Sequence, residues 1–420
     1  MLNQNQPTSP VTATIPTRAH LFEQRQLKSL WAKPLTKLLG KPIAPSRQYR
    51  QALLDGLWQG DPLMDQVVEW ICEADSKQRK QLFEQALQQG LDSLDDCPAP
   101  LYNFFSVIEH PPVWLDTQQL KIAQQFMHSV GLNANYILKD MALMGGYLLS
   151  GFNQALVLTG ALDKNASQRL AETSKWWMDC TEVNGLQRFS NGFKSTVHVR
   201  MIHALVRRNL QRKSEWQAEQ WGLPICQIDM AATNLAFCSL FLLGLRAIGI
   251  FPTMRESKAV MHFWKYLGWL MGVDETWLVN SETDGHILLY HTMLTQSAPD
   301  WTSKALGYAL SQEPLTKHYD TWQRLKRSWD YHKRLSISQY FLGRKKMRLL
   351  GVEQRVLPWY PLVLLPTNML TYYVQRHLPL LNGYQQVQGR KAQIKHQKGF
   401  GQKGKSILQP HQQHPAYIAS

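Results

Sequence analysis

The stretch Thr196–Leu210, TVHVRMIHALVRRNL, predicts a helix with one apolar face. Val199 stands four residues before His203, and Val206 and Leu210 stand three and seven residues after it. Residues at these spacings share one side of a helix, so His203 lies within an apolar stripe. The stretch therefore predicts a helix that packs against other helices and holds an imidazole in its packed face.

A histidine on the apolar face of a helix allows two interpretations. A neutral histidine on an apolar surface is what a proximal haem ligand requires. Arg200 and Arg207, three residues before and four residues after His203, could then meet the haem propionates. The alternative is a buried histidine that makes an ordinary hydrogen bond, and helical periodicity alone favours this second interpretation.

A second candidate site lies on the preceding predicted helix, in the segment RLAETSKWW at 169–177. Arg169, Glu172 and Thr173 occupy positions i, i+3 and i+4, so they project from one side of that helix. A cation, a carboxylate and a hydroxyl could together line a polar catalytic pocket beside a bound oxidant, with Glu172 as the acid–base group. The alternative is a solvated helix face with a local Arg–Glu pair.

Composition predicts a folded, helical chain. Of the 420 residues, 44% are hydrophobic and only 18% are charged, and the 15 tryptophans need burial. Convincing alternating strand patterns are absent, and no internal repeat is evident. We therefore predict an all-α fold with a single large helical domain. The expected helices cover about 77–94, 116–130, 166–180, 195–212, 225–248, 254–272, 284–296, 313–326 and 334–350, with a long apolar run at 133–160.

Three regions divide the chain. Residues 1–45, rich in Pro, Thr, Gln and Lys, are expected to form an extended arm, 46–380 the helical domain, and 381–420 a disordered basic tail. Two apolar stretches, at 235–251 and 356–374, are interpreted as buried core helices rather than as a membrane anchor, because an arginine, glycines or prolines interrupt them.

Charge and cysteine content suggest a compartment and partners. The net charge of +15 is partly concentrated at 388–405, so it is interpreted first as a property of the tail, and peripheral contact with an anionic membrane is a further possibility. Nucleic acid is not expected, since the core has no basic patch interleaved with aromatic residues. The five cysteines lack C-x-x-C spacing, and the N-terminus lacks an apolar signal region, so a reducing, cytoplasmic location is expected. Phosphate-loop, dinucleotide-binding, H-E-x-x-H and G-x-S-x-G motifs are also absent.

The two candidate helices together resemble the latex-clearing protein, or rubber oxygenase, family, which includes the fungal mycophenolic-acid pathway oxygenase. That family has an Arg-x-x-x-Thr helix followed by a haem-binding histidine in a hydrophobic-His-Ala-x-Val-Arg setting. Here Arg169 and Thr173 precede MIHALVR at 201–207, and His203 follows Arg169 by 34 residues. Two further segments are similar: GLPICQIDM at 222–230, and GLRAIG at 244–249 leading into HFWKYLGWLMG at 262–272.

The resemblance implies a globin-like helical core around haem b, with His203 as the iron ligand. It also implies an oxygenase that uses dioxygen on a hydrophobic small molecule, since the best-studied members cleave a carbon–carbon double bond of polyisoprene. One departure matters, because those members carry a lysine directly before the threonine and this chain has Glu172. An ionised carboxylate cannot donate a hydrogen bond. Haem binding therefore carries over better than polymer cleavage, and a haem-binding homologue without oxygenase activity is the alternative.

Overall fold

The computed structural model describes residues 14–28, 36–37, 40–160, 166–319, 321–402 and 405–406. The elements, in chain order, are η1 (Thr17–Ala19), α1 (Phe22–Lys28), α3 (Arg47–Asp55), α4 (Pro62–Glu73), α5 (Ser76–Gln89), η2 (Leu91–Ser93), α6 (Ala99–Ile108), α7 (Thr117–Ser129), α8 (Asn133–Asn135), η3 (Tyr136–Leu143), α9 (Met144–Gly146), α10 (Ser150–Leu158), α11 (Ala166–Thr181), α12 (Asn191–Gln211), α13 (Ala218–Trp221), α14 (Gln227–Phe237), α15 (Ser239–Ala247), α16 (Met254–Leu270), η4 (Glu275–Trp277), α17 (Glu282–Leu294), α18 (Trp301–Thr316), α19 (Gln323–Leu349), α20 (Trp359–His377), α21 (Pro379–Lys398), β1 (Gly401–Gln402) and β2 (Lys405–Ser406).

The all-α prediction is confirmed. Within the described ranges, the only strands are the two-residue pair β1 and β2 near the C-terminus. The predicted helices at 77–94, 116–130, 166–180 and 254–272 correspond to α5, α7, α11 and α16. Each of α5, α7 and α16 begins at a side-chain cap; for α16, Thr253 and Glu256 form a reciprocal capping box.

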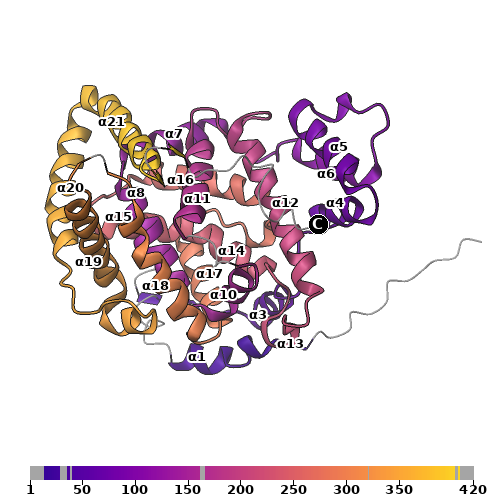
Figure 1. Ribbon diagram of the computed structural model, residues 1–420, viewed down its shortest axis with the longest axis horizontal. Coiled ribbons are helices and arrows are strands. Elements are labelled where there is room, and N and C mark those ends of the chain that lie inside the picture. Colours follow the sequence, from indigo (N-terminus) through magenta and orange to yellow (C-terminus); the bar gives the residue numbers. More distant parts are fainter. Residues whose placement is uncertain are drawn as a thin grey trace, which may run out of the picture.

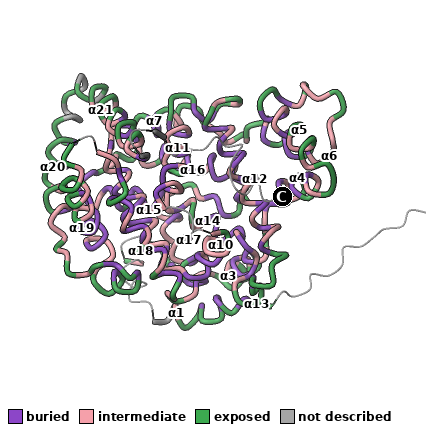
Figure 2. The backbone as a smooth tube through the Cα atoms, viewed as in Figure 1, coloured by how far each residue is buried: buried purple, intermediate pink, exposed green. Residues whose placement is uncertain are grey.

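The long helix α12 lies between two hydrophobic cores. A small core joins α4, α5 and α6 to the face of α12 that carries Phe193, Val197 and Met201. The main core lies on the other side and includes α7, α14, α15 and α16 (Figure 1). Buried residues are concentrated in the middle of the molecule, and the outer edges of α20 and α21 are largely exposed (Figure 2). Helix α12 therefore packs against hydrophobic residues on both of its sides.

Three helix predictions need correction. The segment predicted as one helix at 225–248 is broken at Cys238, which separates α14 from α15. The helix predicted at 313–326 is wrong, because α18 starts earlier, at the Asp300 cap, and ends at Thr316. The run at 133–160 contains a π-helical segment, η3, and then bends by 96° before α10.

The prediction of an extended N-terminal arm is wrong for residues 14–28. Arg18 is buried and forms an ion pair with Asp229, with the guanidinium Nη1 3.0 Å from Oδ2. Phe22 is buried in the main hydrophobic core. One buried charge pair and one aromatic anchor hold a segment whose composition is otherwise that of a linker. Residues 1–13 lie outside the described residues.

The prediction of a disordered basic tail is also wrong up to Phe400. Helix α21 packs along α7, and its Arg390 donates to Glu182 at 2.7 Å. Gln393 donates to the carbonyl oxygens of Met127 at 2.9 Å and Gly131 at 3.2 Å. Polar side chains thus dock this helix by bonding to backbone carbonyls, an interaction that apolar periodicity does not reveal. The end of the tail, 407–420, lies outside the described residues.

The two apolar stretches have different outcomes. Among the described residues, Gln227–Ala247 is one helical stretch long and apolar enough to cross a membrane, and the bent pair Asn133–Gly146 and Ser150–Leu158 would count as a second. Of the apolar window in Gln227–Ala247, 61% is buried within the protein, as expected for a core helix. The stretch at 356–374 is not a buried core helix, because α20 leaves much of its apolar surface exposed. All five cysteines are free thiols.

Two glycines of α21 provide a test of its docking. A Cβ at Gly389 would lie 2.1 Å from the carbonyl oxygen of His128, whereas a Cβ at Gly383 would meet nothing within 4 Å. Alanine normally favours a helix over glycine by about 1 kcal/mol. We therefore expect Gly383→Ala to raise the free energy of unfolding slightly and Gly389→Ala to lower it by about 1–3 kcal/mol through overpacking. Urea unfolding of both variants measures the difference, and equal stabilisation by both would show that α21 does not pack on α7.

Candidate active site

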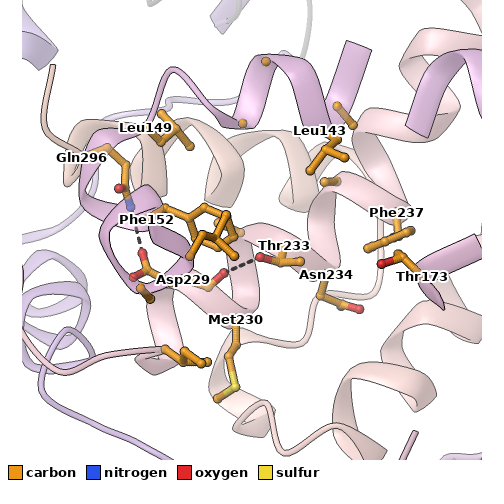
Figure 3. Close-up of a pocket in the computed structure, with 18 of the residues that line it drawn as sticks. Leu143, Leu149, Phe152, Thr173, Asp229, Met230, Thr233, Asn234, Phe237 and Gln296 are labelled. Atoms are coloured by element: carbon orange, nitrogen blue, oxygen red, sulfur yellow. Dashed lines mark hydrogen bonds between the residues drawn. The ribbon is translucent and has the colours of Figure 1, made fainter. Parts of the chain in front are cut away.

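A large cavity lies beside α12 in the centre of the molecule. Its volume is about 1860 Å³, well above the roughly 300–1,000 Å³ typical of small-molecule pockets. Most of its lining is apolar, and Figure 3 shows Leu149 and Phe152 on one side and Met230 and Phe237 on another. The cavity can therefore accommodate a large apolar ligand, or a flat cofactor together with a second apolar molecule.

His203 is part of the wall of this cavity. Val199, Ile202 and Val206 of the same helix line the cavity with it, as the predicted apolar stripe requires. Burial lowers the pKa of His203 to about 4, and the charge of Arg207 adds to the effect, so the imidazole is neutral at pH 7. Its Nδ1 is buried and has no hydrogen-bond partner among the described residues. This imidazole is thus neutral and its Nδ1 is not held by the ordinary hydrogen bond that the alternative interpretation supposed.

Arg200 and Arg207 do not line the cavity. Arg200 donates to both carboxylate oxygens of Asp61, at 2.5 and 2.7 Å, and to the carbonyl oxygen of Leu270 at 3.1 Å. Arg207 donates to Asp65 and, at 3.0 Å, to the carbonyl oxygen of Ile225.

This placement corrects the prediction that both arginines meet haem propionates. Positions three before and four after His203 fall on the flank of α12 that packs against α4, while Val199 and Val206 fall on the opposite flank. The two guanidiniums are buried and already paired with carboxylates. Their role in this structure is to hold α12 against α4.

Arg169, Glu172 and Thr173 all line the same cavity as His203. The side chain of Arg169 forms a hydrogen bond with the buried phenol of Tyr147. The Oε1 of Glu172 accepts from Gln168 at 3.0 Å, and the Thr173 hydroxyl donates to the carbonyl oxygen of Arg169 at 3.0 Å. The structure therefore brings the α11 trio and the α12 histidine together at one cavity.

A smaller chamber of about 150 Å³ adjoins this polar wall, and Arg169 and Thr173 line both spaces. Three of its lining side chains have a buried polar atom without a hydrogen-bond partner among the described residues: Asn135 Oδ1, His396 Nε2 and Gln397 Oε1. Three unpartnered polar atoms at one space of this size are suited to bind ordered water. The chamber can therefore hold water next to the α11 trio.

Sequence reasoning missed the residues that α21 brings to this chamber. Gln393, His396 and Gln397 lie within one helical turn and face the chamber with Asn135. Their i, i+3, i+4 spacing was an available signal, but their polar character assigned them to a solvated tail.

Asp229 defines the opposite end of the cavity. It accepts from Arg18 at 3.0 Å and from Gln296 at 2.9 Å, and Figure 3 shows Gln296 reaching it beside Phe152. Two residues earlier, Gln227 donates to the carbonyl oxygens of Gly60 and Gly272, at 2.6 and 2.9 Å. Within the GLPICQIDM segment, Asp229 thus closes one end of the cavity. Gln227 connects α14 to the chain segments at Gly60 and Gly272.

Comparison with known families agrees with this arrangement. The family model described as "ER-bound oxygenase mpaB/B'/Rubber oxygenase, catalytic domain" matches residues 128–367, more than half of the chain. The chain belongs to this family. The matched range includes His203, the α11 trio and Asp229, so the resemblance predicted from the sequence is confirmed.

Two known proteins show the extent of the similarity. The "Rubber oxygenase" of Streptomyces sp. (strain K30) is 22% identical over 199 residues, which cover 46% of this chain and 47% of that protein. The match therefore spans about half the length of this relative. The solved "Structure of Latex Clearing Protein LCP in the closed state" has a TM-score of 0.59 at 17% identity and covers 81% of this chain and 91% of the other. At this identity the structural likeness establishes a shared helical fold.

The Arg200–Asp61 pair can be tested by stability. Arg200→Met leaves the Asp61 carboxylate buried without its cation, which should lower the free energy of unfolding by about 3 kcal/mol. Arg200→Met/Asp61→Asn removes the uncompensated charge while keeping a side-chain oxygen at the N-terminus of α4, so it should recover a large part of that loss. Urea unfolding provides the measurement. If Arg200→Met alone were as stable as wild type, the arginine would not hold α12.

Proposed function

We propose that this protein is a haem b-dependent oxygenase that uses dioxygen to oxidise a hydrophobic, unsaturated small molecule of isoprenoid or lipid type. The observation that carries the proposal is the neutral His203 in the wall of a large apolar cavity that Arg169, Glu172 and Thr173 also line. Membership of an oxygenase family supports it.

The residues around His203 fit a haem. A neutral imidazole in the wall of the cavity has the nitrogen lone pair that an axial iron ligand needs. Gly145 and Gly146 line the same cavity, and a Cβ at Gly146 would meet no atom within 4 Å, so the wall beside Gly146 is open. Bound at His203, haem would supply the activation of dioxygen, while the protein supplies orientation and electrostatics.

The chain's own residues can bind and orient polar species at the other side of the cavity. Arg169, held by the Tyr147 phenol, presents a positive charge that would attract an anionic oxygen species. The Glu172 carboxylate, oriented by Gln168, can accept a proton. The apolar walls exclude bulk water from the reacting molecule, and the small chamber beside Thr173 can exchange water or protons with this wall.

A haem-binding protein without oxygenase activity is the second candidate. Glu172 favours it, because this carboxylate stands where the best-studied members of the family have a lysine. A carboxylate repels an anionic ligand where a lysine would bind it. The two candidates share haem binding and differ only in turnover.

Four forms of the protein separate these possibilities: wild type, His203→Ala, His198→Ala and Glu172→Gln. His198 is the matched control, because it lies five residues earlier on α12 and its Nε2 is 2.7 Å from Glu84. We expect a Soret band and full haem content in every form except His203→Ala. Oxygen uptake with squalene as the probe should be similar for wild type and His198→Ala, and about 100-fold lower for Glu172→Gln, the usual contribution of a positioned acid or base.

Full haem content in His203→Ala would refute the assignment of the ligand. Haem binding without oxygen uptake, for squalene and for unsaturated fatty acids alike, would favour the non-catalytic candidate. Uptake by Glu172→Gln at the wild-type rate would exclude Glu172 as the acid–base group.

A further inference from the structure

Helix α20 has an apolar surface that faces away from the protein. Its inner side is covered, with Asn368 and Tyr372 buried against the core. On its outer side, Leu362, Leu370 and Tyr373 are 62%, 67% and 67% exposed. Their neighbours at helical spacing, Val363, Met369 and Val374, are exposed as well. Helix α20 is therefore apolar on its solvent side over several turns, which is unusual for an outer helix of a soluble protein.

The apolar surface continues onto both neighbouring helices. On α21, the exposed apolar residues are Leu381, Tyr384, Val387 and Ile394. At the start of α19, Trp322, Leu325 and Trp329 are exposed, and the Trp329 ring lies 5.1 Å from that of Trp359 at the start of α20. Helices α19, α20 and α21 lie along one edge of the molecule (Figures 1 and 2), and their exposed apolar residues named above are called the α19–α21 face.

Cations dominate the exposed charges of the helices that form this face. Among the residues of 321–400 whose exposure the structure describes, the exposed charged residues are ten cations and one carboxylate, Glu353. The cations are Arg324, Lys326, Arg344, Lys345, Lys346, Arg348, Arg355, Lys391, Lys395 and Lys398. The other carboxylate of this segment, Asp330, is buried and paired with Lys317 and Lys333. The face therefore combines exposed apolar and aromatic side chains with a strong, unbalanced positive charge.

We propose that the α19–α21 face binds the surface of an anionic lipid bilayer. Leucine, valine and tryptophan side chains enter the boundary between headgroups and acyl chains, and lysine and arginine side chains bind the lipid phosphates. The charge argues against a second copy of the chain, because a symmetric dimer would place two sets of the same cations against each other. Nucleic acid offers the negative charge but no apolar layer for the side chains of α20.

The bilayer would also lie next to the cavity. Phe341, Leu342, Lys346 and Leu349 of α19 line the cavity, and Lys346 and Leu349 are also exposed at the protein surface. Part of the cavity rim thus lies on the last turns of α19, beyond the break in that helix at Gly343. If the proposed oxygenase function is correct, a lipid-soluble substrate can enter from the membrane; this consequence rests on that function, whereas membrane binding does not.

Co-sedimentation of the full-length protein with vesicles tests the proposal. Vesicles of equimolar phosphatidylcholine and phosphatidylglycerol should bind wild type, and raising the salt concentration should weaken binding. Leu362→Glu/Leu370→Glu should reduce binding at least tenfold. Its matched control is Tyr102→Glu/Val113→Glu, which makes the same change of charge at two exposed apolar residues in and after α6, and which should bind as wild type does. Arg344→Gln/Lys345→Gln should lower affinity and make binding less sensitive to salt.

Circular dichroism and urea unfolding establish that each variant is folded, and sedimentation velocity reports the oligomeric state. Equal reduction by both pairs of glutamates would show that general charge, not the α19–α21 face, governs binding and would overturn the proposal. So would a wild-type dimer that Leu362→Glu/Leu370→Glu converts to a monomer without any vesicle binding, since a second copy would then cover this face. Tight binding to duplex DNA with none to vesicles would overturn it as well.

Discussion

Two buried arginines, each paired with a carboxylate at the start of α4, fix the rotation of α12, and the candidate active site depends on that rotation. Arg200 and Arg207 are seven residues apart on α12 and are held by Asp61 and Asp65, at and just after the start of α4. Buried charges are costly unless they are paired, so α12 cannot turn about its axis without breaking both pairs. Because the side of α12 that carries Arg200 and Arg207 is fixed against α4, the neighbouring side of α12 places His203 in the cavity wall.

A second group of buried charges fixes the other side of the site. Lys139 and Asp140 of η3 pair with Glu313 of α18 and Arg334 of α19. Lys139 and Asp140 lie within the π-helical turns of η3. The π-helix is a wider helix form that is frequent at functional sites.

His396 of α21 is near this group. Burial, together with the positive charges of Lys317, Arg334 and Lys139, lowers its pKa well below the usual value. It is therefore neutral, and its unpartnered Nε2 can exchange a hydrogen bond with water in the chamber beside Thr173. The helix that the sequence assigned to a tail thus completes the wall of this chamber, which shares Arg169 and Thr173 with the cavity.

The sequence predicted those features of the fold and the site that depend on residue spacing within one helix. The helical fold, the apolar stripe around His203 and the common side of Arg169, Glu172 and Thr173 follow from spacing within one helix, and the structure places all four residues at one cavity. Arg200 and Arg207 show the limit of that reasoning.

Helical spacing gave the angular position of both arginines but not the carboxylates of α4 that bind them, which lie more than a hundred residues earlier in the chain. Arg18 and His396 could not be placed for the same reason, because the residues that surround them in the fold are distant in sequence. The exposed apolar side of α20 was missed because composition cannot distinguish a helix buried on two sides from one that leaves a side open.

Chemical rescue of His203→Gly is the most direct test of the central claim, that α12 presents His203 to the cavity as an iron ligand. The substitution removes the imidazole and leaves a space of matching size. The account predicts a weak or altered Soret band in His203→Gly, restored towards the wild-type spectrum when free imidazole is added. A wild-type spectrum in His203→Gly without imidazole would contradict it.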